Sequence, residues 1–320
     1  MRPVGDIRIF CIDGAEPREL KGSSVALEKS LQTYIENNLE SLVGVTFLAS
    51  EHSTGKTHGG RIDTLGIDEN GFPVIIEYKR ATNENVINQG LYYLDWLLDH
   101  KAEFEMMVRR KMGEAYEEKI DWSGPRLLCI AGDFTKYDLH AVQQINRNID
   151  LVRYRKFDDN LLLLELVTTA AQNRVDVPKP IAVPAEGTEQ RSPHARQRSP
   201  HARSTFSEIL ARSAPELRDR FEALKACIEA LGDDVQMKEL KYYVAFRRIK
   251  NFACVELRIS KSEIVVWVSI DPDTVKLKEG FTRDVRGIGH YGTGDLEILI
   301  RSDEDLERAK PLILQSYESN

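Results

Sequence analysis

Cysteine is scarce in this sequence and is never closely spaced. Four cysteines occur among 320 residues, at positions 11, 129, 227 and 254. No C-x-x-C pair is present, so the cysteines indicate neither a zinc motif nor a disulfide framework. We therefore expect reduced thiols packed in the protein core.

Long apolar runs are absent as well. The densest run, 161–164, ends at Glu165, whereas a membrane helix needs about 18 apolar residues. The first twenty residues alternate polar and apolar types and include Asp6, Asp13 and Glu16, so they lack the apolar segment of a secretory signal. We expect no membrane association and a cytoplasmic location.

An excess of positive charge is missing too. The net charge of −7 argues against a protein that coats nucleic acid through its overall field. A local basic groove is still compatible with this charge. The clusters Lys79–Arg80, Arg109–Lys111 and Arg153–Lys156 either line such a groove or form ordinary solvated faces.

The segment 171–205 divides the chain. It holds five of the twelve prolines, and the hexapeptide Arg-Ser-Pro-His-Ala-Arg occurs twice in it, at 191–196 and 198–203. This composition cannot bury a core, so we predict a disordered linker that acts as a spacer. Contact with DNA and phosphorylation are the alternative uses of the repeat. The chain then has two domains, 1–170 and 206–320.

Hydrophobic periodicity predicts an α/β first domain and an α+β second domain. In the first, helices are expected at 25–42, 85–112 and 139–148, and strands at 7–12, 45–49, 61–68, 72–80, 126–131, 151–154 and 161–167. In the second, a helix at 206–231 with a break near Pro215 precedes strands at 241–246, 253–259, 263–270 and 296–300, and Ser302 caps a final helix.

Charged residues interrupt the apolar hairpin 61–80. If Glu69-Asn70-Gly71 is a three-residue loop, Asp63 lies opposite Glu77, with their Cβ atoms roughly 5 Å apart. A two-residue Asn-Gly loop instead places the two carboxylates on opposite faces. The sequence leaves both registers open.

In the first register, a divalent cation such as Mg²⁺ relieves the repulsion between the two carboxylates. Lys79 follows on the same strand face and can hold an attacking water or stabilise charge on a phosphoryl group. This set suits hydrolysis of a phosphodiester. The alternative is a structural ion pair of Lys79 with Asp63 or Glu77.

These residues resemble the signature of the PD-(D/E)XK nuclease superfamily. The Gly-Arg-Ile-Asp at 60–63 followed by Ile-Glu-Tyr-Lys at 76–79 is similar to the nuclease domain of NucS-like endonucleases, and Gln89-x-x-x-Tyr93 is similar to a motif of RecB-like members. The resemblance covers roughly residues 20–155. The proline of the classical motif is replaced by Ile62, so only Asp63 carries over from it.

The resemblance implies a restriction-endonuclease-like mixed sheet flanked by helices, and it assigns roles. Asp63, Glu77 and the carbonyl of Tyr78 would bind Mg²⁺ or Mn²⁺, Lys79 would be the catalytic lysine, and Gln89 would position the substrate backbone or that lysine. The helix acid would be Glu28, with Glu36 as the alternative. Arg61, Arg80 and Tyr93 are the candidates for substrate contacts.

Residues 206–320 resemble a bacterial C-terminal domain of unknown function that is sometimes labelled a predicted transport protein. The lack of a membrane span speaks against that label. Aromatic and basic residues alternate at 242–250, which is typical either of a nucleic-acid platform or of core aromatics with surface bases.

The sequence thus predicts an Mg²⁺-dependent deoxyribonuclease, an endonuclease rather than an exonuclease, acting in DNA repair or in defence against foreign DNA. The alternatives are a catalytically silent nuclease fold that binds nucleic acid or protein, and an interaction protein whose first domain is only a scaffold. DNA is the expected partner. A homodimer and a further partner of the C-terminal domain are additional expectations.

Overall fold

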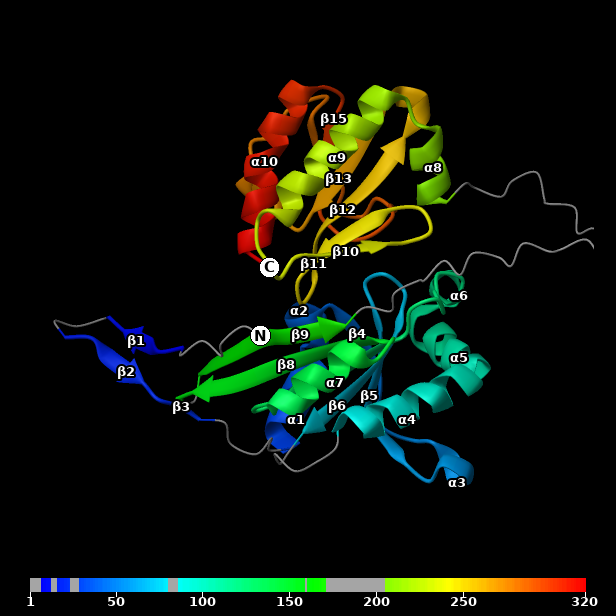
Figure 1. Cartoon of the computed structure of the whole chain (residues 1–320), viewed down its shortest axis with the longest axis vertical. Helices are drawn as coiled ribbons and strands as arrows, with labels where there is room; N and C mark the ends of the chain where they lie inside the picture. Colours follow the sequence, from blue (N-terminus) through cyan, green and yellow to red (C-terminus); the bar gives the residue numbers. More distant parts are fainter. Residues whose placement is uncertain (1–6, 13–15, 24–28, 80–85, 159, 171–204) are drawn as a thin grey trace, which may run out of the picture.

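The structure is a computed structural model that describes residues 7–12, 16–23, 29–79, 86–158, 160–170 and 205–320. These residues form an N-terminal unit, up to residue 170, and a C-terminal unit, from residue 205, which lies on top of it in Figure 1. The predicted linker lies outside the described residues except for Thr205, whose side chain caps the first helix of the C-terminal unit by accepting from Glu208 N.

The described part of the N-terminal unit is built on a seven-stranded mixed sheet with the order β3-β8-β7-β6-β5-β4, and β9 also pairs with β8. The parallel pairs are β6–β7 and β7–β8, and the other pairs are antiparallel. A separate hairpin of β1 and β2 extends away from the sheet (Figure 1). The strands are β1 (Ile9–Cys11), β2 (Arg18–Leu20), β3 (Gly22–Ser23), β4 (Val45–Ser53), β5 (Arg61–Asp68), β6 (Pro73–Lys79), β7 (Arg126–Ala131), β8 (Asn148–Phe157) and β9 (Leu161–Ala170).

Helices cover both faces of this sheet, because its central strands are apolar on both sides. The helices are α1 (Lys29–Asn37), α2 (Leu39–Val43), α3 (Gly55–His58), α4 (Val86–Asp99), α5 (Lys101–Met112), α6 (Glu114–Glu117) and α7 (Lys136–Gln144). One core joins α1 and α2 to Ile76 and Tyr78 of β6. The other joins α4, α5 and α7 to Leu65 and Ile75. The predicted α/β class with a mixed sheet is confirmed.

Three predicted helices of the N-terminal unit have different bounds. The helix expected at 25–42 is described from Lys29 and is divided at Asn38 into α1 and α2. The helix expected at 85–112 is divided at His100, whose backbone leaves the helical region (φ −116°, ψ 35°) while its ring stacks on Trp96. The helix expected at 139–148 starts earlier, because Thr135 and Asp138 form a capping box, and it ends at Gln144. The strand β8 then begins at Asn148.

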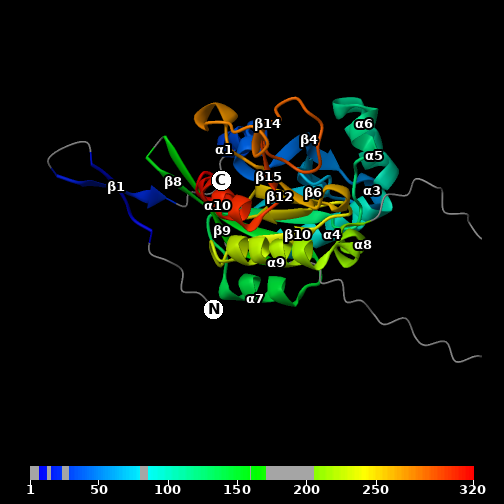
Figure 2. The same ribbon diagram turned by 90° about the horizontal axis from the view of Figure 1, so that it is seen from above.

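The described C-terminal unit has a six-stranded antiparallel sheet with the order β10-β11-β12-β13-β15-β14. Its strands are β10 (Gln236–Glu239), β11 (Val244–Arg247), β12 (Asn251–Arg258), β13 (Glu263–Val268), β14 (Thr282–Asp284) and β15 (Leu296–Ile300), its helices are α8 (Phe206–Arg212), α9 (Pro215–Glu229) and α10 (Asp303–Glu318), and its 3-10 turns are η1 (Ile259–Lys261) and η2 (Pro272–Thr274). The three helices pack on one face of the sheet, as Figure 2 shows from above for α9 and α10.

The helix break at Pro215 and the cap at Ser302 are confirmed. Ser302 accepts from Asp305 N, but the Asp305 carboxylate accepts from Arg301 N, so the box is only half formed. The strands β10 and β14 are missing from the sequence prediction, because they are four- and three-residue strands at the sheet edges.

All four cysteines lie in the described residues as free thiols. Cys129 and Cys254 are buried, whereas Cys11 and Cys227 are only partly so. No helix in the described ranges has the length and apolar character to cross a membrane.

The turn of the β5–β6 hairpin has three residues, Glu69-Asn70-Gly71. The flanking residues pair as in that register, with Ile67 opposite Pro73 and an Asp68 N–H donating to Phe72 O at 2.9 Å. Gly71 has a φ of +84°, a conformation that disfavours any residue with a Cβ. The register that aligns Asp63 with Glu77 is therefore the one the protein adopts.

We expect Gly71→Ala to destabilise the protein by more than about 1 kcal/mol, since a Cβ there is strained and also meets Lys119 O at 2.4 Å. Thermal unfolding measures this loss. Gly59→Ala is the matched control, because Gly59 also has a positive φ of +60° but a Cβ added to it would have nothing within 4 Å. Equal losses at the two positions would show that the contact with Lys119 has no effect.

Candidate catalytic and metal-binding site

Strands β5 and β6 separate where Asp63 and Glu77 lie. The backbone ladder between them ends at the pair Thr64–Ile76. Beyond it, side chains take over the pairing: Asp63 N donates to Glu77 Oε1 at 3.2 Å, and Tyr78 N donates to Asp63 Oδ2 at 3.0 Å. The two predicted carboxylates thus meet at the fork of the hairpin.

β7 accounts for the separation. β6 continues its parallel pairing with β7 through Glu77, Tyr78 and Lys79, while β5 stays paired with β4 as far as Arg61. Each strand keeps its outer neighbour, so the sheet opens only between the two carboxylate-bearing positions. The side chains of Asp63 and Glu77 are held by backbone N–H groups in that opening, which fixes their orientation.

The Glu77 carboxyl is buried beside a like charge. Its pKa is raised to about 9, first by burial and then by the Asp63 carboxylate; the Asp63 N–H opposes this shift, and the Glu51 carboxylate adds to it. Without a cation, the folded protein therefore holds Glu77 protonated at neutral pH. A cation placed between the carboxylates would favour ionised Glu77.

Glu51 is the acid that sequence reasoning missed. Ser50 pairs with Thr64 and His52 with Ile62, so Glu51 of β4 lies opposite Asp63. It has a positive φ of 54°, which is unusual for glutamate, and its carboxylate forms an ion pair with Arg61. The register of β4 against β5 could have revealed Glu51, but the shift between Phe47 and Ala49 hides that register in the sequence.

The Gln-x-x-x-Tyr motif of α4 reaches the start of β5. Gln89 Nε2 donates to the Tyr93 hydroxyl at 3.2 Å, and that hydroxyl accepts from Arg61 N at 3.1 Å. A Cβ on Gly60 would meet the Tyr93 ring at 2.5 Å, so glycine permits this close contact. The motif therefore holds the backbone at Arg61, two residues before Asp63. The Arg61 side chain remains exposed.

The other predicted residues are placed differently. Glu28 and Arg80 lie outside the described residues, and for Lys79 the structure describes the strand but not the side chain. Glu36 accepts from Ser50 Oγ at 2.9 Å and from Thr64 Oγ1 at 2.6 Å. Thr64 points to the α1 side of the sheet, so Glu36 joins α1 to β4 and β5. Tyr78 also directs its ring into that side, and its carbonyl remains the candidate ligand.

The donor set fits a hard cation. Two carboxylates and a backbone carbonyl are oxygen ligands, and Mg²⁺ commonly takes one or two carboxylates together with waters and phosphate oxygens. Within the described ranges, no three His, Cys, Asp or Glu side chains are grouped to hold a metal ion. A site of this kind does not need a third such side chain from the protein.

Two histidines beside the site have other partners. His52 Nε2 lies 3.2 Å from Glu103 Oε1, and its ring packs against Trp96. His58 packs against Tyr92, whose hydroxyl donates to His58 O at 3.1 Å. These contacts tie the β4–β5 connection to α4.

Two arginines of the basic clusters pair with acids of the N-terminal unit. Arg153 is buried and lies 3.1 Å from Asp133 and 3.0 Å from Glu165. Arg109 lies 2.9 Å from Glu114. These two positions are structural ion pairs.

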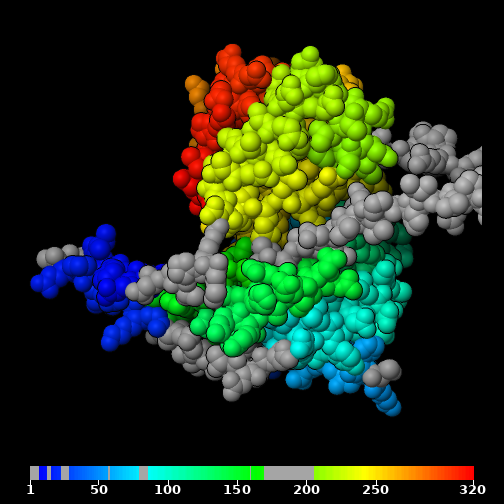
Figure 3. Space-filling model, in the orientation of Figure 1, coloured from blue at the N-terminus to red at the C-terminus, as the bar shows by residue number. Residues whose placement is uncertain are grey.

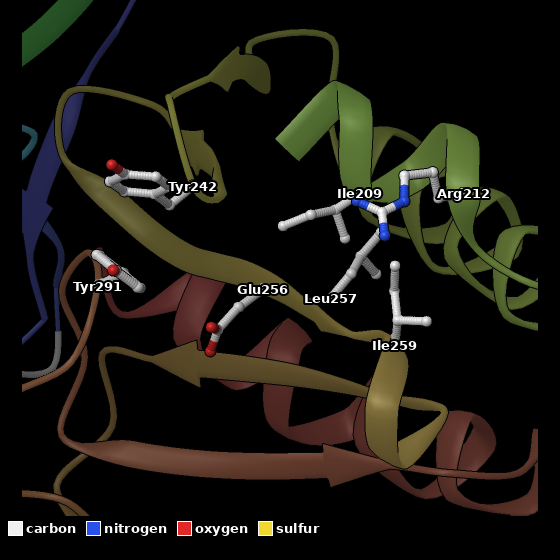
Figure 4. Close-up of a pocket in the computed structure, with 7 residues that line it drawn as sticks. All are labelled: Ile209, Arg212, Tyr242, Glu256, Leu257, Ile259 and Tyr291. Atoms are coloured by element: carbon white, nitrogen blue, oxygen red, sulfur yellow. The ribbon is translucent and has the colours of Figure 1, made fainter. Parts of the chain in front are cut away.

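In the C-terminal unit, the aromatic and basic stretch is mostly internal. Tyr243, Phe246 and Arg247 are buried. A pocket of about 390 Å³ includes Tyr242, Tyr291, Arg212 and Glu256 (Figure 4). The Tyr291 ring packs against both Tyr242 and Tyr243, and Lys241 Nζ lies 5.0 Å from the Tyr242 ring centroid. Tyr242 and Tyr291 therefore line the pocket as partly exposed rings that already pack against each other.

Comparison with known proteins matches the C-terminal unit to a family. Residues 206–320 match the model described as domain of unknown function DUF5655. The whole chain is similar to an uncharacterized protein of Haemophilus influenzae, with 29% identity over 314 residues, which are 98% of this chain and 100% of that protein.

Two solved structures are similar to part of the chain. One is a repair endonuclease from Pyrococcus abyssi, with 16% identity, a TM-score of 0.27, and coverage of 41% of this chain and 48% of that chain. The other is an EndoMS–dsDNA complex, with 19% identity, a TM-score of 0.24, and coverage of 41% and 46%. The chain therefore spans about half the length of the solved chains it matches.

The raised pKa of Glu77 predicts a cost in stability. Unfolded glutamate ionises near pH 4.5 but folded Glu77 near pH 9, so stability falls as pH rises between these values. We expect Glu77→Gln to raise the free energy of unfolding at pH 8 by on the order of 3 kcal/mol in chelator, and to have no such effect near pH 4. Denaturant unfolding at both pH values measures this difference, with the exposed Glu222→Gln as control. A glutamine variant no more stable than wild type at pH 8 would refute the raised pKa.

Proposed function

We propose that the N-terminal unit is a metal-dependent nuclease that hydrolyses phosphodiester bonds of DNA, as an endonuclease. The observation that supports this best is the fork of the β5–β6 hairpin, where Asp63 and Glu77 are held side by side by backbone N–H groups. Placing the buried Glu77 carboxyl beside the partly exposed Asp63 is unfavourable for stability, and two neighbouring carboxyls are a set that can bind a divalent cation.

The residues of the fork have separate roles in this proposal. Asp63, Glu77 and the Tyr78 carbonyl hold Mg²⁺ or Mn²⁺, which when bound lowers the pKa of a water and stabilises phosphoryl charge. Lys79, two residues after Glu77 on the same strand, positions the attacking water or donates to the phosphoryl oxygen. Gln89 and Tyr93 orient the start of β5, and Arg61 and Arg80 contact the phosphate backbone.

Glu51 adds an electrostatic role. Its carboxylate forms an ion pair with Arg61 and raises the pKa of Glu77. In the nuclease, this ion pair holds Arg61 at the edge of the site, where a phosphate can displace Glu51 from the guanidinium.

The decisive experiment is a cleavage assay. The purified protein is incubated with supercoiled, single-stranded and branched DNA, and with RNA, in the presence of Mg²⁺ or Mn²⁺. We expect cleavage of DNA that chelator abolishes, and a loss of at least about 100-fold in Asp63→Ala and in Lys79→Ala. The exposed Asp219→Ala and Lys276→Ala serve as controls and should cut like wild type.

Three outcomes contradict the proposal. If all substrates survive, the nuclease assignment is wrong. If the two variants cut as well as wild type, the site assignment is wrong. If DNA binds but is not cut, the fold is a silent binding module.

A further inference from the structure

The C-terminal unit forms hydrogen bonds with the turn of the β5–β6 hairpin, which carries the candidate site. Asn251 N donates to the Glu69 carboxylate at 2.8 Å, and Asn251 Nδ2 donates to Asn70 Oδ1 at 2.8 Å. The same Asn70 oxygen accepts from the Tyr243 hydroxyl at 3.1 Å. Two of the three turn residues are thus bound by side chains or backbone of β12 and the segment before β11. Figure 3 shows the C-terminal unit lying above the N-terminal unit.

Buried ion pairs also connect the two units next to this turn. Arg126 of β7 bridges Asp68 at 2.8 Å and Asp150 of β8 at 2.6 Å, and Arg247 of β11 reaches the same Asp150 carboxylate at 3.0 Å. All four side chains are buried. Because each buried charge depends on its partners, the chain of charges ties the end of β5 to the C-terminal unit.

Apolar packing around Phe72 also joins the hairpin to the C-terminal unit. Phe72, the last residue before β6, is buried in a cluster whose other members come from the C-terminal unit, including Tyr243 and Trp267. Lys238 Nζ lies 5.3 Å from the centroid of the Phe72 ring. The C-terminal sheet therefore uses the face opposite its own helices to enclose the hairpin turn.

We propose that the C-terminal unit positions the carboxylate pair, with Tyr243, Asn251 and Arg247 as positioning residues that act through the hairpin turn. The inference rests on the proposed nuclease function and deepens it. The site end of the hairpin is forked and lacks a backbone ladder between β5 and β6, so its geometry depends on the outer strands β4 and β7, on the ladder from Thr64 to Ile67 and on the turn beyond it.

The length of the hairpin makes this coupling direct. The turn and the fork are separated by about five residues of regular strand, or roughly 17 Å. The backbone ladder ends at the pair Thr64–Ile76, so the two strands can move apart at the open end. A firmly held turn resists that movement, because a change in register or hinge angle would have to break the contacts of Glu69 and Asn70.

The test uses the full chain with Asn70→Ala, Tyr243→Phe and the double variant. Tyr243→Phe removes one hydroxyl from a buried ring and leaves the packing in place. Amide hydrogen exchange at Asp63 and Tyr78 reports on the fork without any need for activity, with Leu151 of β8 as a reference inside the same sheet. Matched controls are Asn160→Ala and Tyr137→Phe, both at exposed positions.

We expect about three- to tenfold faster exchange at Asp63 and Tyr78 in each single variant, and unchanged exchange at Leu151. The double variant should be no faster than the faster single variant, because both substitutions remove one shared contact. Where DNA is cut, kcat should fall with little change in KM.

Other outcomes overturn the proposal. If exchange accelerates only at the turn, or nowhere, the C-terminal unit does not position the fork. If KM rises while kcat is unchanged, the C-terminal unit contributes substrate binding instead. A wild-type protein that cuts no nucleic acid removes the proposed function, but the exchange measurement still decides whether the C-terminal unit holds the carboxylate pair.

Discussion

The three-residue turn between β5 and β6 is the constraint on which the candidate site depends. Side chains alternate along a strand, so the length of this turn decides whether Asp63 and Glu77 share a face. The turn is fixed from several directions: Gly71 supplies the positive φ, Gly71 O accepts from Asp121 N at 2.9 Å, and Asn251 of the C-terminal unit binds Glu69. Residues distant in the sequence thus determine the geometry of a short local motif.

The site and the interface both use acids in unfavourable environments. Glu77 is buried next to Asp63, and Glu69 is half-buried at the contact with the C-terminal unit, where desolvation raises its pKa to about 7. Buried carboxyls reduce stability unless a partner compensates them. At Glu69 the Asn251 N–H is such a partner; at Glu77 the Asp63 N–H is one, and a cation would add to it.

The sequence predicts local features well and long-range ones poorly. Periodicity was sufficient for most strands and helices, and the Asn-Gly pair restricted the turn to two registers. The choice between them depends on Lys119, Asp121 and Asn251, whose proximity no local pattern reveals. Glu51 was missed for a similar reason, because the bulge in β4 shifts its register against β5. At the break between α4 and α5, the His100 ring stacks on Trp96, a contact that a helical pattern does not indicate.

Surface turns usually tolerate insertions and deletions, but this turn should not. Adding or removing one residue between Asp68 and Phe72 would reverse the face of every following side chain in β6 and would also displace Asn70 from Tyr243 and Asn251. In descendants of this chain, the spacing between the aspartate and the glutamate is therefore expected to stay constant even where the intervening residues change. The length of the turn would then be inherited more strictly than its composition.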